Sequence, residues 1–388
     1  MSNIYFTEEH NLFRESLRDF LEKEVVPHIE KWEETGTIEQ FIWKKFGDMG
    51  YFGLAYPKKY GGLDLDLFYT VILLEELQRI NSGGFAAAIW AHAYLAMTHL
   101  NKEGDDTIKS KYLAGSIAGD MIGCLCVTEP FGGSDVAGMR TTAIKEGDHY
   151  ILNGSKTFIT NGVYSDYMVV AAKTNPELGN KGISMFVVDS SAKGVSATKL
   201  DKLGWRASDT GEIAFDNVKI PVNQLMGEEG KGFAYIMQHF ALERLIMGIN
   251  AHARAEYALE YTLQYMSERT TFGKSLDKYQ ALRHRYVDMH ADMQLCKHYN
   301  YMVADRLDKG EYVVEEATIS KLKSTKMADE VAYNCLQFLG GYGYMEEYPL
   351  ARIFRDSRLG PIGGGTSEIL KEILSKIIID KKSYKPAT

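Results

Sequence analysis

The feature that most limits how this chain can fold is a change in hydrophobic periodicity, which occurs twice along the sequence. The first part spaces its apolar residues at three and four, as amphipathic helices do. Near residue 121 short β-rich runs begin, and the helical spacing returns beyond the stretch "GEEGKGF". The sequence therefore predicts an α+β protein with a helical domain at 1–120, a β domain at 121–228 and a helical domain at 229–388. With 388 residues, 45% of them hydrophobic, the chain can bury a large core.

The first helix is predicted from "EEHNLFRESLRDFLEKEVVPHIEKW". Five residues in this stretch are spaced as one buried stripe, namely Leu12, Phe13, Leu17, Phe20 and Leu21. Helical patterns continue through "LFYTVILLEELQRI" and "DDTIKSKYLAGSI". Beyond the β part, breaks near "RTTFGKS" and "LGGYGYMEEYP" divide the second helical region.

The middle part contains short runs rich in β-branched and aromatic residues, such as "HYILNGSKTFITNG", "DYMVVAAKT", "GISMFVVDSS" and "GEIAFDNVKIP". Two Asn-Gly pairs, at Asn153-Gly154 and Asn161-Gly162, are strong turn signals. This pattern predicts an antiparallel β unit of about a hundred residues.

Composition and charge exclude several classes of protein. The formal net charge of -8 argues against a nucleic-acid-binding protein. The most apolar stretch, "FAAAIWAHAYLAM", is too short for a membrane span and is interrupted by His92. The amino-terminal residues resemble neither a secretory signal nor a transit peptide, so we expect a cytoplasmic protein of bacterial type, or a mitochondrial matrix protein if the chain is a processed eukaryotic one. The four cysteines, Cys124, Cys126, Cys296 and Cys335, predict neither a zinc site nor a disulfide framework.

Three loop-like stretches carry candidate binding groups. The first, "CVTEPFGGSDVAGMRT", offers backbone N–H groups and hydroxyls to an acceptor-rich ligand, although it would also suit an ordinary β-turn. The second, "KTFITNG", places Phe158 and Thr160 on one face of a strand, where they can cover a flat heterocycle or form a half-buried strand. The third, "ERTTFGKSLDKYQ", suits a phosphate, a subunit contact or a plain helix–helix loop.

The fourth stretch, "QHFALERLIMGI", places Glu243 and Arg244 in a strongly apolar helix. Phe240, Ile246 and Met247 lie three or four residues from Glu243 and therefore share its face. Desolvation there would raise the pKa of the carboxyl group into the range of a useful general base. The alternative is a structural ion pair with Arg244.

The stretch "GPIGGGTSEILKEIL" places three glycines in a row before an apparent helix start. A glycine run is costly to order, so it requires a reason. It is either an awkward turn before a helix or a place where bare backbone approaches a ligand.

Together these stretches resemble the acyl-CoA dehydrogenases. The motifs "CVTEPFGGSDVAG", "FITNG", "RTTFGK", "QFLGGYGYMEEYP" and "GGGTSEI" occur in the order and at the spacing of that family, and "YFGLAYPKKYGG" extends the resemblance toward the amino terminus. The resemblance implies non-covalent FAD, an acyl-CoA substrate and a homotetramer. It also implies an N-terminal helical domain, a middle antiparallel β-barrel-like domain and a C-terminal four-helix bundle.

The resemblance further implies which residues bind FAD. Phe158 would cover the flavin face where many members have Trp, and Thr160 would lie near the reactive nitrogen. Arg269, Phe272 and Gln280 would reach the FAD of a neighbouring subunit. The full set of implied cofactor-binding residues is Cys126, Val127, Thr128, Gly133, Ser134, Phe158, Ile159, Thr160, Arg269, Thr271, Phe272, Leu276, Tyr279, Gln280, Gln337, Gly340, Gly341, Thr366 and Glu368. The implied substrate-binding residues are Ser134, Arg244, Gly364 and Gly365.

One departure concerns the catalytic base. Many members carry the catalytic glutamate within "YEGT", where this chain has Gly363-Gly364-Gly365-Thr366. The long-chain and isovaleryl subgroups instead carry it within "ERL" on the preceding long helix, and this chain has Glu243-Arg244-Leu245 there. The resemblance therefore implies that Glu243 abstracts the α-proton, that flavin accepts the β-hydride, and that an electron-transfer flavoprotein receives the electrons.

Some alternatives stay open at this stage. An acyl-CoA oxidase would use oxygen as acceptor, and no sequence feature separates it from a dehydrogenase. The presence of Glu243 argues against a flavin monooxygenase, which needs no such base. It also argues against a flavin-binding subunit without catalytic activity. Gly363 would widen the cleft, as in the isovaleryl subgroup with "GAGT". The stretches "GWRASDT" and "IGGGTSEILKEIL" are closer to the long-chain subgroup, so we expect a long-chain acyl-CoA substrate in fatty acid β-oxidation.

Overall fold

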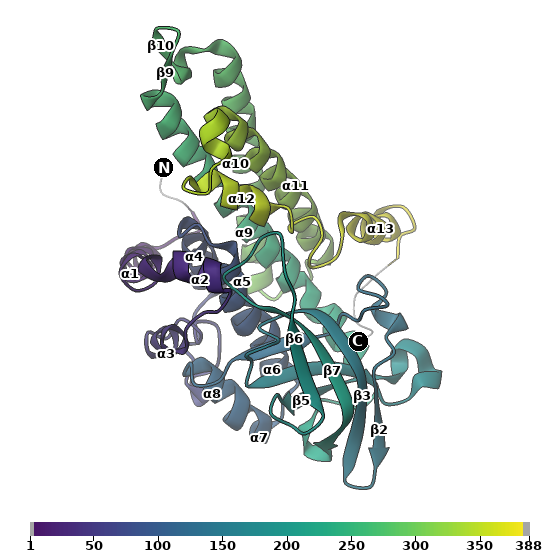
Figure 1. Cartoon of the computed structure of the whole chain (residues 1–388). Helices are drawn as coiled ribbons and strands as arrows, with labels where there is room; N and C mark the ends of the chain where they lie inside the picture. The colour runs from purple at the N-terminus through teal and green to yellow at the C-terminus, as the bar shows by residue number, and fades with distance from the viewer. Residues whose placement is uncertain (1–3, 383–388) are drawn as a thin grey trace.

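The structure is a computed structural model that describes residues 4–382. Helices form both ends of the chain and a sheet forms the middle, so the predicted α+β organisation is confirmed (Figure 1). The domain limits at residues 120 and 228 stay a prediction. The amino-terminal helices are α1 Glu8–Glu24, α2 Ile29–Thr35, α3 Gln40–Asp48, α4 Leu67–Arg79, α5 Gly83–Trp90, α6 Met97–Glu103, α7 Asp106–Ile108 and α8 Ala114–Ile117. Two π-helical stretches, Ala91–Ala96 and Lys109–Leu113, continue α5 into α6 and α7 into α8.

Helix α1 forms as predicted, but its buried face differs from the predicted stripe. Leu17 and Leu21 are buried, whereas Leu12 is 60% exposed. Leu12 lies well off the line through these two residues on a helix of 3.6 residues per turn. His10 takes the buried position two turns before Leu17, where its side chain accepts a hydrogen bond from the Thr7 N–H and completes the helix cap.

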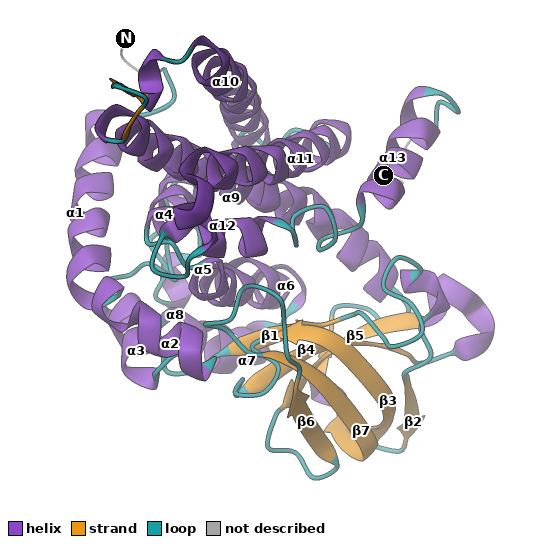
Figure 2. Ribbon diagram, turned by 45° about the horizontal axis from the view of Figure 1, so that its top comes forward, coloured by secondary structure: helices purple, strands orange, loops and turns teal. Residues whose placement is uncertain are grey.

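The middle domain is a curved sheet covered on one side by helices (Figure 2). Its strands are β1 Gly123–Cys126, β2 Thr142–Glu146, β3 His149–Thr160, β4 Tyr167–Lys173, β5 Ile183–Asp189, β6 Val195–Lys199, β7 Thr210–Pro221 and β8 Leu225–Met226. The order is β6-β7-β3-β2-β4-β5-β8, with β1 pairing β4. Most pairs are antiparallel, as predicted, but β1 runs parallel to β4, and β2 also meets β4 in parallel. The sheet is therefore mixed at this point.

The two Asn-Gly pairs behave differently. Asn161-Gly162 forms the predicted turn after β3, with Asn161 at a positive φ of 63°. Asn153-Gly154 forms no turn, so that prediction was wrong. It lies inside β3 at a bulge, where Gly154 has φ 141° and the Asn153 side chain accepts a hydrogen bond from the Asn217 N–H at 2.8 Å. Pairing of β3 with β7 overrides the local turn preference.

The carboxyl-terminal region is built on three long helices that pack against one another: α9 Gly232–Glu268, α10 Gln280–Asp308 and α11 Val314–Leu339. The small hairpin of β9 Thr270–Thr271 and β10 Lys274–Ser275 joins the first two. Two shorter helices follow, α12 Pro349–Ser357 and α13 Ser367–Ile378. The helices end near "RTTFGKS" and "LGGYGYMEEYP", as predicted. Across residues 4–382, none of the helices has the length and apolar character that crossing a membrane would require.

Helix α9 is held against the amino-terminal helices by buried charged groups. The Glu75 carboxylate of α4 lies 2.7 Å from an Nη of Arg14 and 3.0 Å from Nε2 of His252 on α9. It also accepts a hydrogen bond from the Tyr301 hydroxyl of α10. These contacts hold the pKa of the Glu75 carboxyl at about 2 despite its burial. The helix that carries Glu243 is thus fixed by both helical regions.

Candidate active site

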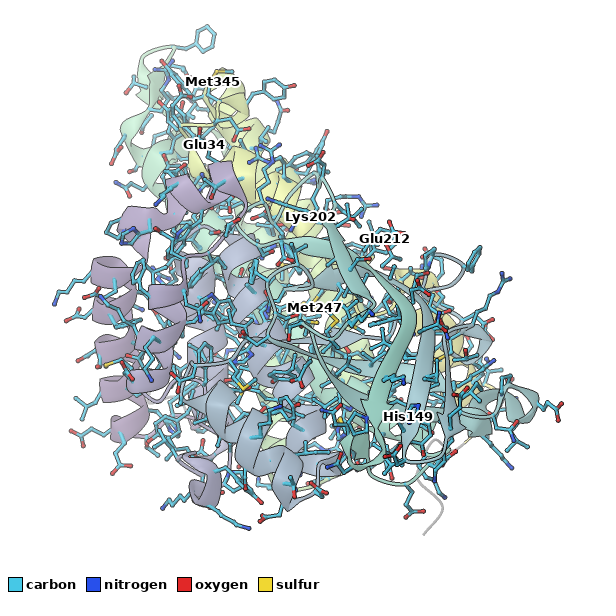
Figure 3. The ribbon with its side chains drawn as sticks, turned by 60° about the horizontal axis from the view of Figure 1, so that its bottom comes forward. Glu34, His149, Lys202, Glu212, Met247 and Met345 are labelled. Carbon is cyan, nitrogen blue, oxygen red and sulfur yellow. The ribbon has the colours of Figure 1, made fainter. Side chains whose placement is uncertain are left out.

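Glu243 lies on α9 about one turn before Met247, which is labelled near the middle of the molecule in Figure 3. Ile236, Ile246 and Met247 on the same helix face are buried, and the Glu243 side chain is half-buried among them. Loss of hydration raises the pKa of the Glu243 carboxyl above its ordinary value. The positive charges of Arg244 and Lys321 lower that pKa in part.

The three-glycine loop faces this carboxylate. Gly364 and Gly365 have positive φ values of 61° and 89°, which a residue with a side chain rarely adopts. A Cβ atom placed on Gly364 would lie 3.4 Å from Oε1 of Glu243 and 3.5 Å from Cγ of Met247. A Cβ on Gly363 would meet nothing closer than Leu359 atoms at 3.7 Å. The glycine run therefore leaves room beside Glu243, and a side chain at position 364 would be directed toward the Glu243 carboxylate.

Helix α11 contributes a residue that sequence reasoning missed. Lys321 is completely buried, and its Nζ donates a hydrogen bond of 2.5 Å to the carbonyl oxygen of Gly365. One turn earlier on α11, Oγ1 of Thr318 accepts a hydrogen bond of 3.1 Å from Nη1 of Arg244. A signal was present in the sequence, because Lys321 shares the buried face of small residues formed by Ala317, Ser324 and Ala328.

The ends of the glycine loop are fixed by its own backbone and by the cap of α13. The Gly363 N–H donates to Leu359 O at 2.9 Å, and the Ser367 N–H donates to Pro361 O at 3.0 Å. Thr366 caps α13, its hydroxyl accepting from the Ile369 N–H at 3.4 Å. Glu368 is exposed on the first turn of that helix.

A second group of predicted residues lies in the sheet domain. Oε1 of Glu129 lies 2.8 Å from Nζ of the fully buried Lys156, which also donates to Val127 O at 3.2 Å. Glu129 also accepts hydrogen bonds from the N–H groups of Arg140 and Thr141. The stretch 126–134 and strand β3 are therefore joined through a buried ion pair, and neither Glu129 nor Lys156 was predicted as a site residue.

Phe158, in the same strand, has an unusual backbone conformation and an exposed side chain. It lies at a bulge of β3 with a positive φ of 59°, and its ring is 69% exposed. A left-handed conformation costs a residue with a side chain about 1–2 kcal/mol. Strained backbone that presents an aromatic ring to the outside is characteristic of ligand sites. The predicted positions of Cys126, Ile159 and Thr160 adjoin it, with Cys126 and Ile159 buried and Thr160 half-buried.

A third group lies at the opposite end of the molecule, around the β9–β10 hairpin (Figure 1). A cavity of about 540 Å³ is lined there by six of the predicted residues, Arg269, Thr271, Leu276, Gln337, Gly340 and Gly341. Phe272 at the hairpin tip is 98% exposed, and the Tyr279 hydroxyl donates to Thr271 O at 2.6 Å. The chain therefore places the predicted cofactor residues in three separate groups, in the sheet domain, around the hairpin and at the start of α13 with Thr366 and Glu368, and does not unite them.

Comparison with known proteins agrees with this architecture. The chain matches the acyl-CoA dehydrogenase N-terminal domain over residues 7–120, the middle domain over 124–218 and the C-terminal domain over 230–379. It is 37% identical over 382 residues to the mitochondrial long-chain specific acyl-CoA dehydrogenase of Mus musculus, covering 96% of this chain and 87% of that protein.

Two further proteins are similar over nearly the whole chain. The mitochondrial isovaleryl-CoA dehydrogenase of Arabidopsis thaliana is 36% identical over 378 residues, covering 97% of this chain and 92% of that protein. The crystal structure of an acyl-CoA dehydrogenase from Geobacillus kaustophilus has a TM-score of 0.95 at 39% identity, covering 97% of this chain and 100% of that one. The chain belongs to the acyl-CoA dehydrogenase family of FAD-dependent oxidoreductases that act on acyl-CoA.

Proposed function

We propose that this protein oxidises a long-chain acyl-CoA thioester to the trans-2-enoyl-CoA, with Glu243 removing the α-proton. The observation that carries the proposal is the position of Glu243 opposite Gly364. The family places its usual catalytic glutamate at the position of Gly364, and here a Cβ at that position would lie 3.4 Å from Oε1 of Glu243. The two positions border the same space, so a carboxylate on α9 can serve where the loop has none.

The sheet-domain residues fit the flavin of FAD. The exposed Phe158 ring offers a flat surface, and Thr160 two residues later offers a hydroxyl at its edge. The Glu129–Lys156 pair fixes the neighbouring stretch that carries Val127, Thr128 and Ser134. FAD, when bound, supplies the hydride acceptor that no protein side chain can provide.

The chain's own residues supply the acid–base and polar chemistry. A base works best when its pKa lies near the working pH, and burial moves the pKa of Glu243 in that direction. Charge develops on the thioester oxygen as the α-proton leaves. The Gly364 N–H would donate to that oxygen, an interaction that typically lowers such barriers by about 3–4 kcal/mol. Glycine suits this position because it lets backbone approach the ligand closely.

Chain length is the finer part of the proposal. Room beside Gly363 fits either a long chain or the branch of an isovaleryl group. Identity to the long-chain and isovaleryl relatives is nearly equal, so the long-chain choice depends on the sequence motifs. A higher specificity constant for palmitoyl-CoA than for isovaleryl-CoA supports it, and the reverse order supports the branched-chain alternative.

The separation of the hairpin group of cofactor residues from the other predicted cofactor residues supports a homotetramer in which the Arg269 side of one subunit completes the site of another. We further propose an electron-transfer flavoprotein as acceptor and a role in fatty acid β-oxidation. The test is an anaerobic titration with palmitoyl-CoA and isovaleryl-CoA. Bleaching of the flavin with formation of the enoyl-CoA is expected. Unchanged absorbance with both substrates contradicts the proposal, and rapid peroxide formation in air favours an oxidase.

A further inference from the structure

We propose that Lys321 is a positioning residue of this active site. It holds the glycine loop through the Gly365 carbonyl, and together with Arg244 it places positive charge near Glu243. The inference depends on the proposed role of Glu243 as the base.

The first observation is the burial of Lys321. Its side chain is completely buried in α11, and its Nζ donates a hydrogen bond to the backbone carbonyl of Gly365 at 2.5 Å. Burying an ammonium group is costly unless opposite charge and hydrogen bonds compensate. An apolar side chain of similar size would fill the same volume without that cost. The position of the ammonium group against the loop therefore indicates a role there.

The second observation concerns the loop. Its glycines lack side chains, and the bonds to Leu359 and Pro361 fix its ends through neighbouring backbone. Lys321 fixes the middle of the loop from a different helix. Because Gly364 and Gly365 have no Cβ, many backbone conformations besides the positive φ seen here are open to them. The hydrogen bond to Gly365 therefore limits how far Gly364 can move from Glu243.

The third observation is electrostatic. Glu243 and Arg244 of α9 and Glu368 of α13 are the charged groups that act on Lys321. Arg244 and Lys321 are those that act on Glu243. Burial lowers the pKa of Lys321 to about 8, so the lysine is still largely charged at neutral pH. Removing that charge raises the pKa of Glu243, and the carboxylate form then requires a higher pH.

The test compares Lys321→Met, Lys321→Gln and Lys321→Arg with Lys326→Met, which removes an exposed lysine from the same helix. The rate of flavin reduction by palmitoyl-CoA, or by isovaleryl-CoA if that is the better substrate, is measured without oxygen between about pH 5 and about pH 9. Hydrogen exchange of the backbone amides of residues 363–366 is measured in the FAD-loaded protein without substrate.

The acidic limb of the pH profile is the range in which the rate of flavin reduction falls because Glu243 becomes protonated. In Lys321→Met and Lys321→Gln this limb should move to higher pH by about one unit, so the rate at a given pH on the limb falls about tenfold. Lys321→Arg and Lys326→Met should keep the limb in place. The loop amides should exchange faster in Lys321→Met than in Lys326→Met. If Lys321→Met does not fold, Lys321→Gln tests the same charge.

An unmoved limb in a folded Lys321→Met or Lys321→Gln protein contradicts the electrostatic role. Unchanged loop exchange in Lys321→Met contradicts the positioning role. Normal flavin reduction by Glu243→Gln is a different failure, because it removes the proposed base itself. The two proposals therefore fail separately.

Discussion

Glu243 on α9 and Gly364 in the loop before α13 face each other, with Oε1 of Glu243 3.4 Å from the position of a Cβ on Gly364. They are far apart in the sequence and on different elements. The contact distance is an ordinary van der Waals one, so a small side chain at 364 would meet the carboxylate without a severe clash. On this distance we propose that the two positions are alternative sites for one carboxylate.

The first prediction exchanges these sites. Gly364→Glu in a Glu243→Gln background should restore part of the flavin reduction, because the new carboxylate enters the same space. Restoration should be incomplete, since the positive φ of 61° strains any side chain there. Stopped-flow absorbance under anaerobic conditions measures the rate. Gly364→Gln in the same background is the control, and it should restore nothing.

A double variant that binds FAD and acyl-CoA but shows no more reduction than Glu243→Gln would argue against Gly364 as an alternative base position. It would leave the role of Glu243 intact. Equal restoration by Gly364→Gln would show that the gain does not come from a carboxylate.

The second prediction concerns pH and stability. Burial raises the pKa of Glu243 in the folded protein, so the folded state holds the proton more tightly than the unfolded state does. The stabilisation is complete below the ordinary carboxyl pKa and is lost as the pH rises through the raised value. Glu243→Gln should therefore have a higher Tm than the unchanged protein at neutral pH, and the difference should shrink toward about pH 4.

Calorimetry of both proteins between about pH 4 and about pH 8 measures this difference. Glu368→Gln is a suitable control because Glu368 is exposed on α13. A lower Tm for Glu243→Gln than for the unchanged protein at neutral pH would mean that the Glu243 carboxylate stabilises the fold, as in a structural ion pair.

The third prediction concerns the buried Glu129–Lys156 pair beside the residues proposed to bind flavin. Lys156→Met leaves the buried Glu129 carboxylate with the backbone N–H groups of Arg140 and Thr141 as donors and without its charged partner. Breaking a buried pair by removing one partner typically costs about 3–5 kcal/mol. We expect a lower Tm and weaker retention of FAD, measured by flavin absorbance after gel filtration. Lys193→Met, at an exposed lysine of the same domain, should change neither.

The fourth prediction concerns Phe272. The side chain is 98% exposed at the tip of the β9–β10 hairpin, and its φ of 49° is unusual for an aromatic residue. Such a ring is expected to be covered by another subunit. Phe272→Ala should weaken FAD binding and lower the share of tetramer seen by multi-angle light scattering. An unchanged tetramer with unchanged FAD affinity would show that the hairpin tip lies outside the interface.

The sequence was most informative where local patterns and burial agree. The face shared by Glu243 and Met247 follows from helical spacing alone, and the break at Arg269 follows from its glycine-containing loop. Local signals failed where tertiary pairing decided the outcome. Asn153-Gly154 has turn chemistry but is held in β3 by Asn217 across the sheet.

Contacts between distant elements could not be predicted. Lys321 lies on α11 and Gly365 in the loop before α13, and only the packing of α11 against this loop brings them together. The same holds for Glu129, which follows β1, and Lys156, which lies in β3. In both cases the burial of the lysine and the identity of its partner follow only from the three-dimensional structure.

The central claim is that the base of this enzyme lies on α9. Its most direct test is single-turnover reduction of bound flavin by acyl-CoA in Glu243→Gln, without oxygen or electron acceptor, beside Glu368→Gln as control. Substitution of a positioned general base typically costs a factor of about 10²–10⁴. We therefore expect Glu243→Gln to bind FAD and acyl-CoA normally but to reduce flavin at least about a hundredfold more slowly than the control. Reduction at the control rate would contradict the relocated base.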